Sequence, residues 1–258
     1  MFETLTEEWR PKDDGFVWTI PSGWGQGGAV FGGLLAAGAY ALVRSQSERS
    51  VRTIQCQFLA PAVAGPIRAQ LTTMREGKTA SVSQVDLVQD DQLKTRFLFT
   101  SVSPRPGSIK VEPPVGKAWN APETYPELPY IEGLTPEFTQ HLEYRFAEGG
   151  IPFQGSKAAA FGGYVRFRGD EDTVSSHERT IALLDAWPCP TLSVLTKPAA
   201  ASTMTWSIHL LALPAGGFHA FTYETVTAAS GFSTAVGLLR QQDGTLAAYS
   251  EQTVAVFD

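Results

Sequence analysis

The longest apolar segment of the chain, residues 27–43, reads GGAVFGGLLAAGAYALV and contains no charged residue. An apolar segment without a polar stripe predicts a helix that is covered on nearly all sides. Five of its residues are glycines, each of which lowers the stability of a helix interior by about 1 kcal/mol relative to alanine. We therefore expect tertiary packing to stabilise this helix, with the glycines allowing the backbone of a neighbouring sheet to approach closely.

The same segment has one feature of a membrane helix, because its small residues Gly28 and Gly32 are four positions apart. Its 17 residues lie at the lower limit of what crosses a bilayer. The sequence contains no second segment of this kind. We therefore favour a buried helix and expect no membrane insertion.

Polar and apolar residues largely alternate on both sides of this helix, which is the pattern of half-buried β-strands. A strand is predicted at residues 15–20. Residues 51–103 then predict an antiparallel meander of about four strands, separated by a Gly-Lys turn and by an Asp-Asp-Gln turn.

The second half of the chain has the same texture. Strands are predicted at residues 141–146, 161–169 and 202–214, followed by a three-strand meander over residues 217–257. Between them, SSHERTIALLDAW predicts a helix with Ser175 or Ser176 as its N-cap and Glu178 in its first turn.

Landmarks in the two halves keep a nearly constant separation. Pro61 and Pro214 are 153 residues apart, Val85 and Val236 are 151 apart, and Leu93 and Leu246 are 153 apart. We interpret this as a tandem duplication of a strand–helix–four-strand unit. One helix wrapped by a curved antiparallel sheet is a hotdog fold, so the predicted fold class is α+β, a double hotdog. The alternative is two unrelated α+β halves.

The duplication also predicts the domain boundaries. Residues 1–103 form an N-terminal hotdog unit and residues 137–258 form a C-terminal one. Residues 104–136 contain eight of the 17 prolines, which fix φ and remove backbone donors, so they predict an extended linker. Aromatic residues in it suggest that the linker lies against a surface.

Composition and charge argue against several kinds of partner and site. The net charge is −6 and no run of lysine or arginine stands out, so we expect no nucleic-acid partner. Neither Cys56 nor Cys189 lies in a metal-ligand spacing, and we expect two buried free thiols rather than a disulfide. No metal or cofactor motif is present. The N-terminus is polar and acidic and has no signal peptide, so we expect a cytoplasmic protein.

Familiar catalytic signatures are missing, but two polar residues stand out. Asp185 in IALLDAWP is the only charge in an apolar window, and burying a carboxylate is unfavourable unless hydrogen bonds hold it. The alternative is an exposed aspartate at the helix end. Gln252 is predicted on the strand face that carries Ala248, Ser250, Val254 and Val256, against the helix.

The strand predicted at residues 202–214 carries hydroxyl groups and a histidine. Period-2 alternation predicts Thr203, Thr205, Ser207 and His209 on one face. A histidine such as His209 is more often a surface residue or a hydrogen-bonded structural residue than a catalytic one.

Several short motifs, taken in order, resemble the type II acyl-CoA thioesterase family of double hotdog proteins. They are VFGG at the start of the first helix, FLAP at the end of the next strand, and then MREGKTASVSQVDLVQDDQ. The family characteristically has VFGG, FLRP and RDGxSF at these places. In VRTIQCQFL, Arg52 and Gln55 stand where the family often has histidines, which leaves the substrate preference open.

The resemblance implies that Asp185, Thr203 and Gln252 hold a hydrolytic water. The implied reaction converts an acyl-CoA to a free acid and CoA, with no cofactor or metal. In it Asp185 acts as general base or orients the water. The thioester oxygen would bind backbone N–H groups at a helix N-terminus, either at Phe31, Gly32 and Gly33 or at the start of the second helix.

The first half has no acid at the place of Asp185, near Ala39, so we expect one active site per chain, built mainly from the second half. The acyl chain would lie in an apolar tunnel between sheet and helix. The resemblance to the family implies that the chain forms a homodimer or homotetramer. Two alternatives remain: a non-catalytic acyl-binding hotdog protein, and a hotdog hydratase, although no Asp–His pairing stands out near Asp185.

Overall fold

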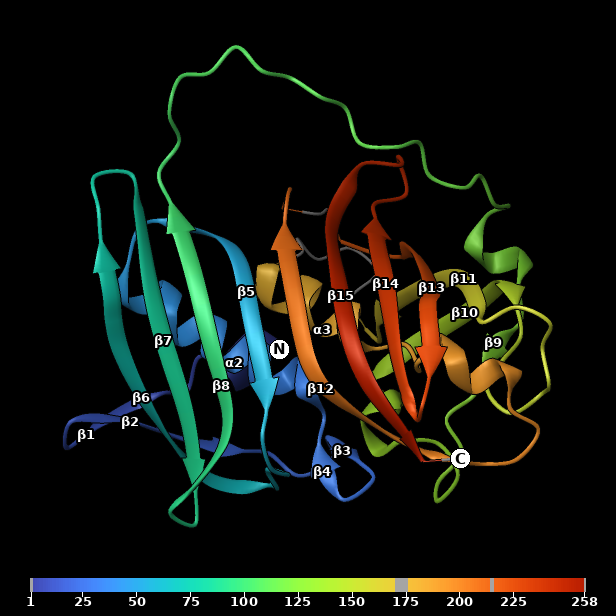
Figure 1. The fold of residues 1–258 in the computed structure, drawn as a ribbon, viewed down its shortest axis with the longest axis horizontal. Helices are drawn as coiled ribbons and strands as arrows, with labels where there is room; N and C mark the ends of the chain where they lie inside the picture. The colour runs from blue at the N-terminus through green and yellow to red at the C-terminus, as the bar shows by residue number, and fades with distance from the viewer. Residues whose placement is uncertain (1, 170–175, 214–215, 258) are drawn as a thin grey trace.

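A computed structural model describes residues 2–169, 176–213 and 216–257 of the chain. One antiparallel sheet of 13 strands forms a curved layer, and the two main helices, α2 and α3, lie against one of its faces (Figure 1). The N-terminal half contains α1 (Phe2–Thr6), β1 (Arg10–Lys12), β2 (Gly15–Ile20), β3 (Gly25–Gln26), β4 (Ala29–Val30), α2 (Gly32–Gln46), β5 (Ser50–Phe58), β6 (Gly65–Glu76), β7 (Ala80–Gln89) and β8 (Gln92–Val102).

The C-terminal half repeats this plan after a connecting segment. That segment contains the 3-10 helix η1 (Pro122–Thr124), β9 (Glu127–Leu128) and the 3-10 helix η2 (Glu137–His141). The repeat consists of β10 (Leu142–Gly149), β11 (Ala160–Phe167), α3 (His177–Asp185), the 3-10 helix η3 (Pro190–Val194), β12 (Ala200–Leu210), β13 (His219–Ala229), β14 (Phe232–Arg240) and β15 (Leu246–Phe257).

The strand order shows the duplication directly. From the centre outward, one half runs β5, β8, β7, β6, β2 and the other runs β12, β15, β14, β13, β11. The two halves join through the antiparallel pair β5–β12, in which Ile54 lies opposite Ile208. The double hotdog α+β fold expected from the sequence is therefore confirmed.

Two pairs of β-bulges allow the halves to be matched residue by residue. The extra residue is Arg52 in the pair β5–β8 and Met204 in the pair β12–β15. A second pair of bulges falls at Met74 in β6 and Val226 in β13. The members of both pairs are 152 residues apart, which agrees with the separation expected from the sequence.

Helix α2 is shorter than predicted, because it begins at Gly32 rather than at Gly27. Gly27 has a φ of 63° and forms, with Gly28, the turn between β3 and β4. A left-handed φ favours glycine, so these two glycines belong to a turn and do not weaken the helix.

The glycines inside α2 allow close contacts, but the sheet backbone is not their partner. A Cβ atom on Gly33 would lie 3.0 Å from the Cα atom of Ala182 in α3, and one on Gly38 would lie 3.0 Å from the Trp18 ring. The expectation about the sheet backbone is therefore wrong. The glycines bring α2 close to the second helix and to a large aromatic side chain.

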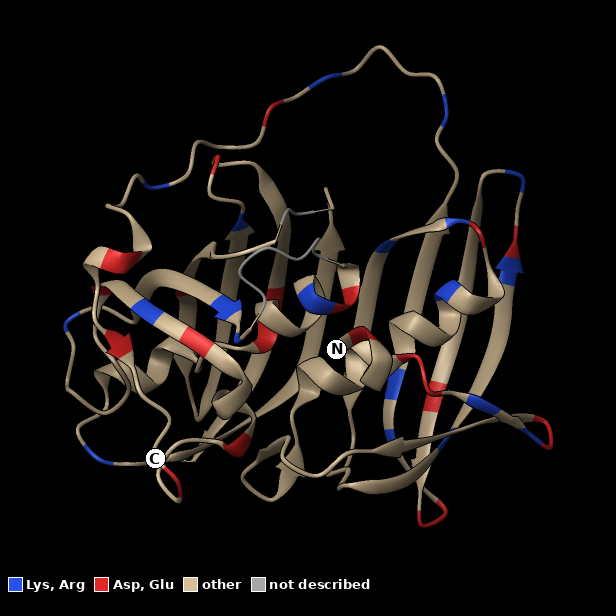
Figure 2. Cartoon of the chain, turned by 180° about the vertical axis from the view of Figure 1, so that it is seen from behind, with Lys and Arg blue, Asp and Glu red and all other residues tan. Residues whose placement is uncertain are grey.

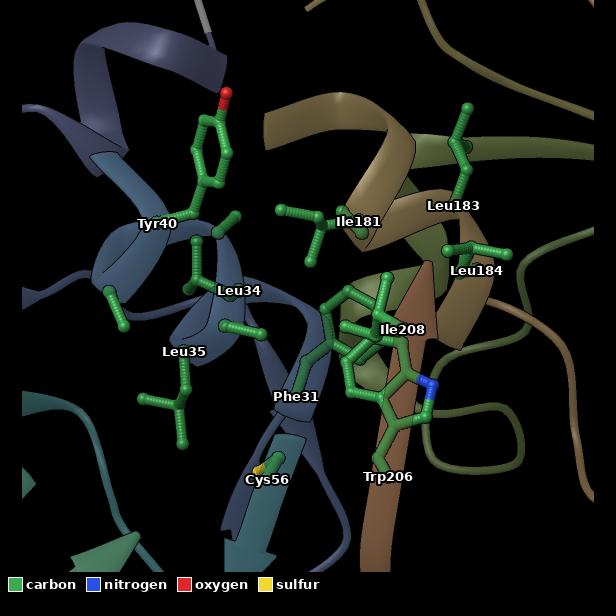
Figure 3. Packing of buried hydrophobic residues seen from close by; sticks show 14 of the residues in the cluster. Phe31, Leu34, Leu35, Tyr40, Cys56, Ile181, Leu183, Leu184, Trp206 and Ile208 are labelled. Carbon is green, nitrogen blue, oxygen red and sulfur yellow. The ribbon is translucent and has the colours of Figure 1, made fainter. Parts of the chain in front are cut away.

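Both helices are buried where they meet. Every residue of α2 from Gly32 to Val43 is buried, and so is α3 from Glu178 to Leu184. Figure 3 shows side chains of α2 and α3 directed into one cluster with Cys56 of β5 and with Trp206 and Ile208 of β12. Packing of this kind stabilises a glycine-containing helix despite its low helix propensity. Among the described residues, no helix is long and apolar enough to cross a membrane.

Helix α3 has conventional ends. The Ser176 hydroxyl caps it by accepting a hydrogen bond of 3.2 Å from the Arg179 N–H, as expected; Ser175, the alternative cap, lies outside the described residues. The helix ends at Asp185, three residues before Pro188. The carboxylate of Asp185 is therefore held at the C-terminal end of α3.

The linker predicted at residues 104–136 is partly ordered against the C-terminal half. The Trp119 ring packs edge-on against Tyr164 at a centroid distance of 5.6 Å, and the Tyr164 hydroxyl donates a 2.9 Å hydrogen bond to the Asn120 carbonyl. Strand β9, within this segment, extends the sheet beside β10.

Seen from the helix side, basic and acidic residues are interspersed along the described chain (Figure 2).

Candidate active site

The site is centred on Asp185 at the C-terminal end of α3. Its side chain is only partly accessible to solvent. Burial disfavours the charged form and raises the pKa of Asp185 from the usual 3.8 to about 7. The Gln252 side chain and the Gly33 backbone N–H act in the opposite direction and keep the rise from being larger. The carboxylate therefore gains and loses its proton near neutral pH.

Asp185, Gln252 and Thr203 form one hydrogen-bonded chain. The Gln252 side-chain amide donates to the Asp185 Oδ1 atom at 2.8 Å. The Gln252 carbonyl oxygen accepts from the Thr203 hydroxyl at 3.1 Å. These bonds fix the amide orientation of Gln252, because its two ends have partners of opposite kind. The structure thus brings together the three residues that the sequence singled out.

The bulge at Met204 places Thr203 in this chain. Alternation predicts Thr203 on the face of Thr205 and His209. The extra residue at the bulge instead turns the Thr203 side chain to the opposite face of the sheet. Thr203 pairs with Val254 and joins the inner face with Gln252. The predicted common face is therefore wrong for Thr203.

His209 remains on the outer face of the sheet, away from this site. Its ring stacks on Tyr249 at a centroid distance of 4.3 Å. Because adjacent residues of a strand point to opposite faces, Tyr249 and Gln252 lie on opposite sides of β15. The surface position that the sequence favoured for His209 agrees with this placement.

The N-terminal half completes the site through the start of α2. A Cβ atom on Gly32 would lie 3.0 Å from the Asp185 Oδ2 atom and 2.9 Å from the Phe58 ring, so the backbone approaches the carboxylate closely. The Gly33 N–H is directed at the same carboxylate. N–H groups in the first turn of a helix have no intrahelical partner, which makes them suited to bind an oxygen.

Phe31 forms a wall of this region rather than a polar contact. It is fully buried as the N-cap residue of α2, and its ring stacks on Phe138 at 4.0 Å between centroids. Its carbonyl accepts the N–H of Leu34 at 3.1 Å. Of the three residues expected to bind substrate, Gly32 and Gly33 therefore contact Asp185 in the structure.

The start of α3 was the other candidate for binding the thioester oxygen, and it lies at the far end of the helix pair. The two helices run in opposite directions, since Arg44 near the end of α2 forms an ion pair of 3.0 Å with Glu178 at the start of α3. Nine residues of helix separate the ends of α3 by roughly 12 Å. This end of α3 is thus not part of the Asp185 site.

That far end is the counterpart of the site in the duplicated fold. Counted from the N-cap residues, Tyr40 takes the place of Asp185 and His177 takes the place of Gly32. The Tyr40 and His177 rings meet edge to face at 5.8 Å, and a cavity of about 490 Å³ opens beside them. No carboxylate occupies the position of Asp185 there, so this helix end has no acidic counterpart of Asp185.

Cys56 and Trp206 lie close to the hydrogen-bonded chain of Asp185 and Gln252, and neither is predicted from the sequence. The Cys56 thiol is buried, and burial together with the charge of Asp185 raises its pKa well above the usual value. Trp206 lies between Cys56 and Gln252 in the strand register. Alternation places both side chains on the inner face, but only the β12–β15 pairing shows that Trp206 lies beside Gln252, and only the β5–β12 pairing shows that Cys56 lies beside Trp206. Both cysteines are free; Cys56 is buried as expected, whereas Cys189 is half-buried.

Comparisons with known proteins agree with the fold and with its division into two units. The structure defines the class as a double hotdog protein. Residues 20–102 match the family model of the acyl-CoA thioesterase N-terminal domain, and residues 122–256 match that of the acyl-CoA thioesterase C-terminal domain. The chain belongs to this acyl-CoA thioesterase family.

Solved structures resemble the whole chain at low sequence identity. A conserved hotdog protein of unknown function from Alicyclobacillus acidocaldarius has a TM-score of 0.88 and 19% identity, covering 100% of this chain and 98% of its own. Acyl-CoA thioesterase II TesB2 from Mycobacterium marinum has a TM-score of 0.79 and 13% identity, covering 100% and 99%. The tesB protein of Mycobacterium avium subsp. paratuberculosis has a TM-score of 0.78 and 16% identity, covering 99% and 98%. No protein with a curated description matches the sequence.

Proposed function

We propose that the protein hydrolyses an acyl-CoA thioester to a free acid and CoA, using a water activated by Asp185. The observation that carries this proposal is the hydrogen-bonded chain from Asp185 through Gln252 to Thr203. Family membership supports the reaction type, and the geometry supports the residues.

Asp185 has the properties of a general base in this reaction. A base works best when its pKa lies near the working pH, and burial raises the pKa of Asp185 to about 7. Ionised Asp185 accepts a proton from the attacking water. Gln252 holds the carboxylate in place, because its amide donates to Oδ1 while its carbonyl is occupied by Thr203.

The start of α2 is suited to hold the thioester oxygen. The Gly33 N–H already faces Asp185, so the adjacent Gly32 N–H is the backbone donor that we assign to the substrate. The departing thiol has a pKa near 8.5, so a thioester leaving group needs no strong acid. The proton held by Asp185 suffices to neutralise the thiolate.

The proposal includes one active site per chain, since Tyr40 replaces the base in the matching position. An acyl chain would lie between the helices and the sheet. The family resemblance implies a homodimer or homotetramer, and the proposal includes a cytoplasmic location and a role in fatty-acyl metabolism. Light scattering of the purified chain tests the oligomeric state.

The direct test is release of free thiol from a panel of acyl-CoAs of different chain lengths. We expect turnover of at least part of the panel by the wild-type chain and its loss in Asp185→Asn. Absence of thiol release from every acyl-CoA, with acyl-CoA still bound, would contradict the proposal and favour the non-catalytic acyl-binding alternative. Hydration of an enoyl-CoA without thiol release would favour the hydratase alternative.

A further inference from the structure

Tyr223 in β13 has a buried hydroxyl group without a hydrogen-bond partner among the described residues. The residue is 2% exposed, and its oxygen is fully enclosed. A buried hydroxyl without a partner destabilises the folded state, so such a group calls for a physical reason. The mechanism described above does not use it.

The Tyr223 ring is directed toward the strand that carries Gln252. Tyr223 lies opposite Gly237 of β14, and Gly237 lies opposite Ser250 of β15. A Cβ atom on Gly237 would lie 2.7 Å from the Phe221 ring and 3.4 Å from the Tyr223 Cδ2 atom, so both rings lie close to this glycine. Because Gly237 has no side chain, β14 leaves room for these two rings on the side of β13 that faces β15.

The aromatic neighbours of Tyr223 connect it to the end of α3. Phe161 and Phe221 lie 6.0 Å and 5.4 Å from the Tyr223 ring, and both also pack on Trp187, at 5.5 Å and 5.7 Å. Trp187 follows Asp185 by two residues. Burial, together with the charges of Cys189 and Asp185, raises the pKa of Tyr223 well above its usual value, so the hydroxyl keeps its proton.

A second buried tyrosine near Asp185 shows what a structural hydroxyl looks like here. The Tyr144 hydroxyl donates a 2.9 Å hydrogen bond to the Ala186 carbonyl and so fixes the end of α3. Tyr144 is 4% exposed, and burial together with the charge of Asp185 raises its pKa, as for Tyr223. The two tyrosines therefore differ in one respect, which is whether the hydroxyl has a protein partner.

The duplicated unit has no tyrosine at the matching place. Tyr223 precedes the bulge residue Val226 by three positions, and Leu71 precedes the bulge residue Met74 by three. The fold therefore accepts an apolar side chain at this point. A hydroxyl appears only in the half that contains Asp185.

We propose that Tyr223 is a catalytic residue whose hydroxyl donates a hydrogen bond to the thioester carbonyl oxygen, in addition to the Gly32 N–H. This inference rests on the proposed function. Water attacks the carbonyl carbon as Asp185 takes its proton, and the C=O electron pair moves onto the oxygen held by Tyr223. The C–S bond then breaks, and the CoA thiolate takes the proton from Asp185. Tyr223 keeps its own proton throughout.

The kinetic test is Tyr223→Phe, with Tyr144→Phe as the matched control. We expect Tyr223→Phe to lower kcat about 10²-fold with KM little changed, as for removal of one oxyanion donor. Its Tm should be unchanged or higher, because a partnerless hydroxyl is removed. Tyr144→Phe should lower Tm instead. An unchanged kcat in Tyr223→Phe would overturn the proposal, and so would a kcat loss explained by a lower Tm.

A binding test separates this inference from the proposed hydrolysis. Two CoA analogues are compared by calorimetry in Asp185→Asn, one with a ketone carbonyl in place of the thioester and one with a methylene in place of that carbonyl. We expect about a tenfold preference for the ketone. The added Tyr223→Phe substitution should reduce this preference severalfold, with the remainder supplied by the Gly32 N–H, whereas Tyr144→Phe should retain it in full. A preference that Tyr223→Phe leaves unchanged, or no preference in the parent, contradicts the role of Tyr223 even if hydrolysis is observed.

Discussion

The two halves of this protein share one backbone plan but differ in the chemistry of their inner faces. Thr203 directly precedes its bulge residue, and Val51 holds that place in the N-terminal half. Gln252 corresponds to Phe99, since each directly precedes the threonine that pairs just after the bulge. Polar groups that hold Asp185 in one half are thus apolar core residues in the other.

This difference shows what a duplication allows. The N-terminal half buries the apolar side chains of Val51 and Phe99 and packs the partly buried Leu71 against the same core, which stabilises the fold. The C-terminal half gives up part of that burial for a partly accessible carboxylate and its hydrogen bonds. It also depends on its neighbour, because Gly32 of the N-terminal half faces Asp185.

The largest expected effect follows Asp185→Asn. Removing the general base should lower kcat/KM about 10²- to 10⁴-fold while the fold is retained. A thiol-release assay beside a circular dichroism spectrum checks this. Full activity in the variant would show that another group is the base.

The same substitution should increase stability at high pH. The pKa of Asp185 is raised on folding from 3.8 to about 7, so protonation favours the folded state, and this favourable effect is lost as pH rises toward and through 7. The loss amounts to at most roughly 4 kcal/mol. An asparagine side chain does not titrate, so Asp185→Asn should be more stable than wild type at pH 8 and similar to it near pH 4. Urea unfolding at both pH values measures the difference.

Gln252→Leu removes the hydrogen bond that lowers the pKa of Asp185. We expect kcat/KM to fall roughly 10- to 100-fold at pH 7 and the pH for half-maximal activity to move upward. Phe99→Leu is the matched change in the N-terminal half. It should lower Tm by leaving a cavity but leave the pH profile unchanged. Equal effects of both variants on the pH profile would remove the distinction between the halves.

Gly32→Ala and Gly38→Ala separate the site from the rest of helix α2. An alanine methyl at Gly32 would meet the Asp185 carboxylate at 3.0 Å, whereas one at Gly38 would meet the Trp18 ring at 3.0 Å. Both should change the free energy of unfolding by about 1–3 kcal/mol. Only Gly32→Ala should lower kcat/KM, by about tenfold, which corresponds to 1.4 kcal/mol. Loss of activity in Gly38→Ala at a temperature where it is folded would argue against this assignment.

The smallest expected effect is that of Thr203→Val, which installs the residue of the N-terminal half. It leaves the Gln252 carbonyl without its donor and should lower kcat/KM about fivefold. Thr205→Val on the opposite face should have no effect on steady-state kinetics. The bulge at Met204 makes this contrast possible, and equal effects would mean that the reversed facing of Thr203 does not matter.

Local sequence patterns predict the double hotdog fold and the inward-facing positions of Asp185 and Gln252. Alternation marks the inner face of β15, and a single charge in an apolar helix marks Asp185. The facing of Thr203 could not be predicted from alternation, because an extra residue in a strand leaves no local signal. The start of α2 was also misplaced, since the hairpin turn at Gly27 reads as part of the same apolar segment.

The contacts between the halves required the structure. Cys56, Trp206 and Tyr223 approach the site through strand pairing across β5, β12 and β13, which no local pattern contains. The same holds for Gly33, whose partner Ala182 lies about 150 residues away in α3. Composition indicates that the helices are apolar. It does not indicate that the start of α2 lies against the Asp185 carboxylate at the end of α3.

The central claim is that ionised Asp185 in the C-terminal half activates the hydrolytic water. The most direct measurement is kcat/KM for thiol release between pH 5 and 9 with the best acyl-CoA of the panel. Because the base acts only when deprotonated, we predict that kcat/KM rises with pH and reaches half its plateau near pH 7. A kcat/KM that is constant over this range, or that falls as pH rises through 7, would contradict the account.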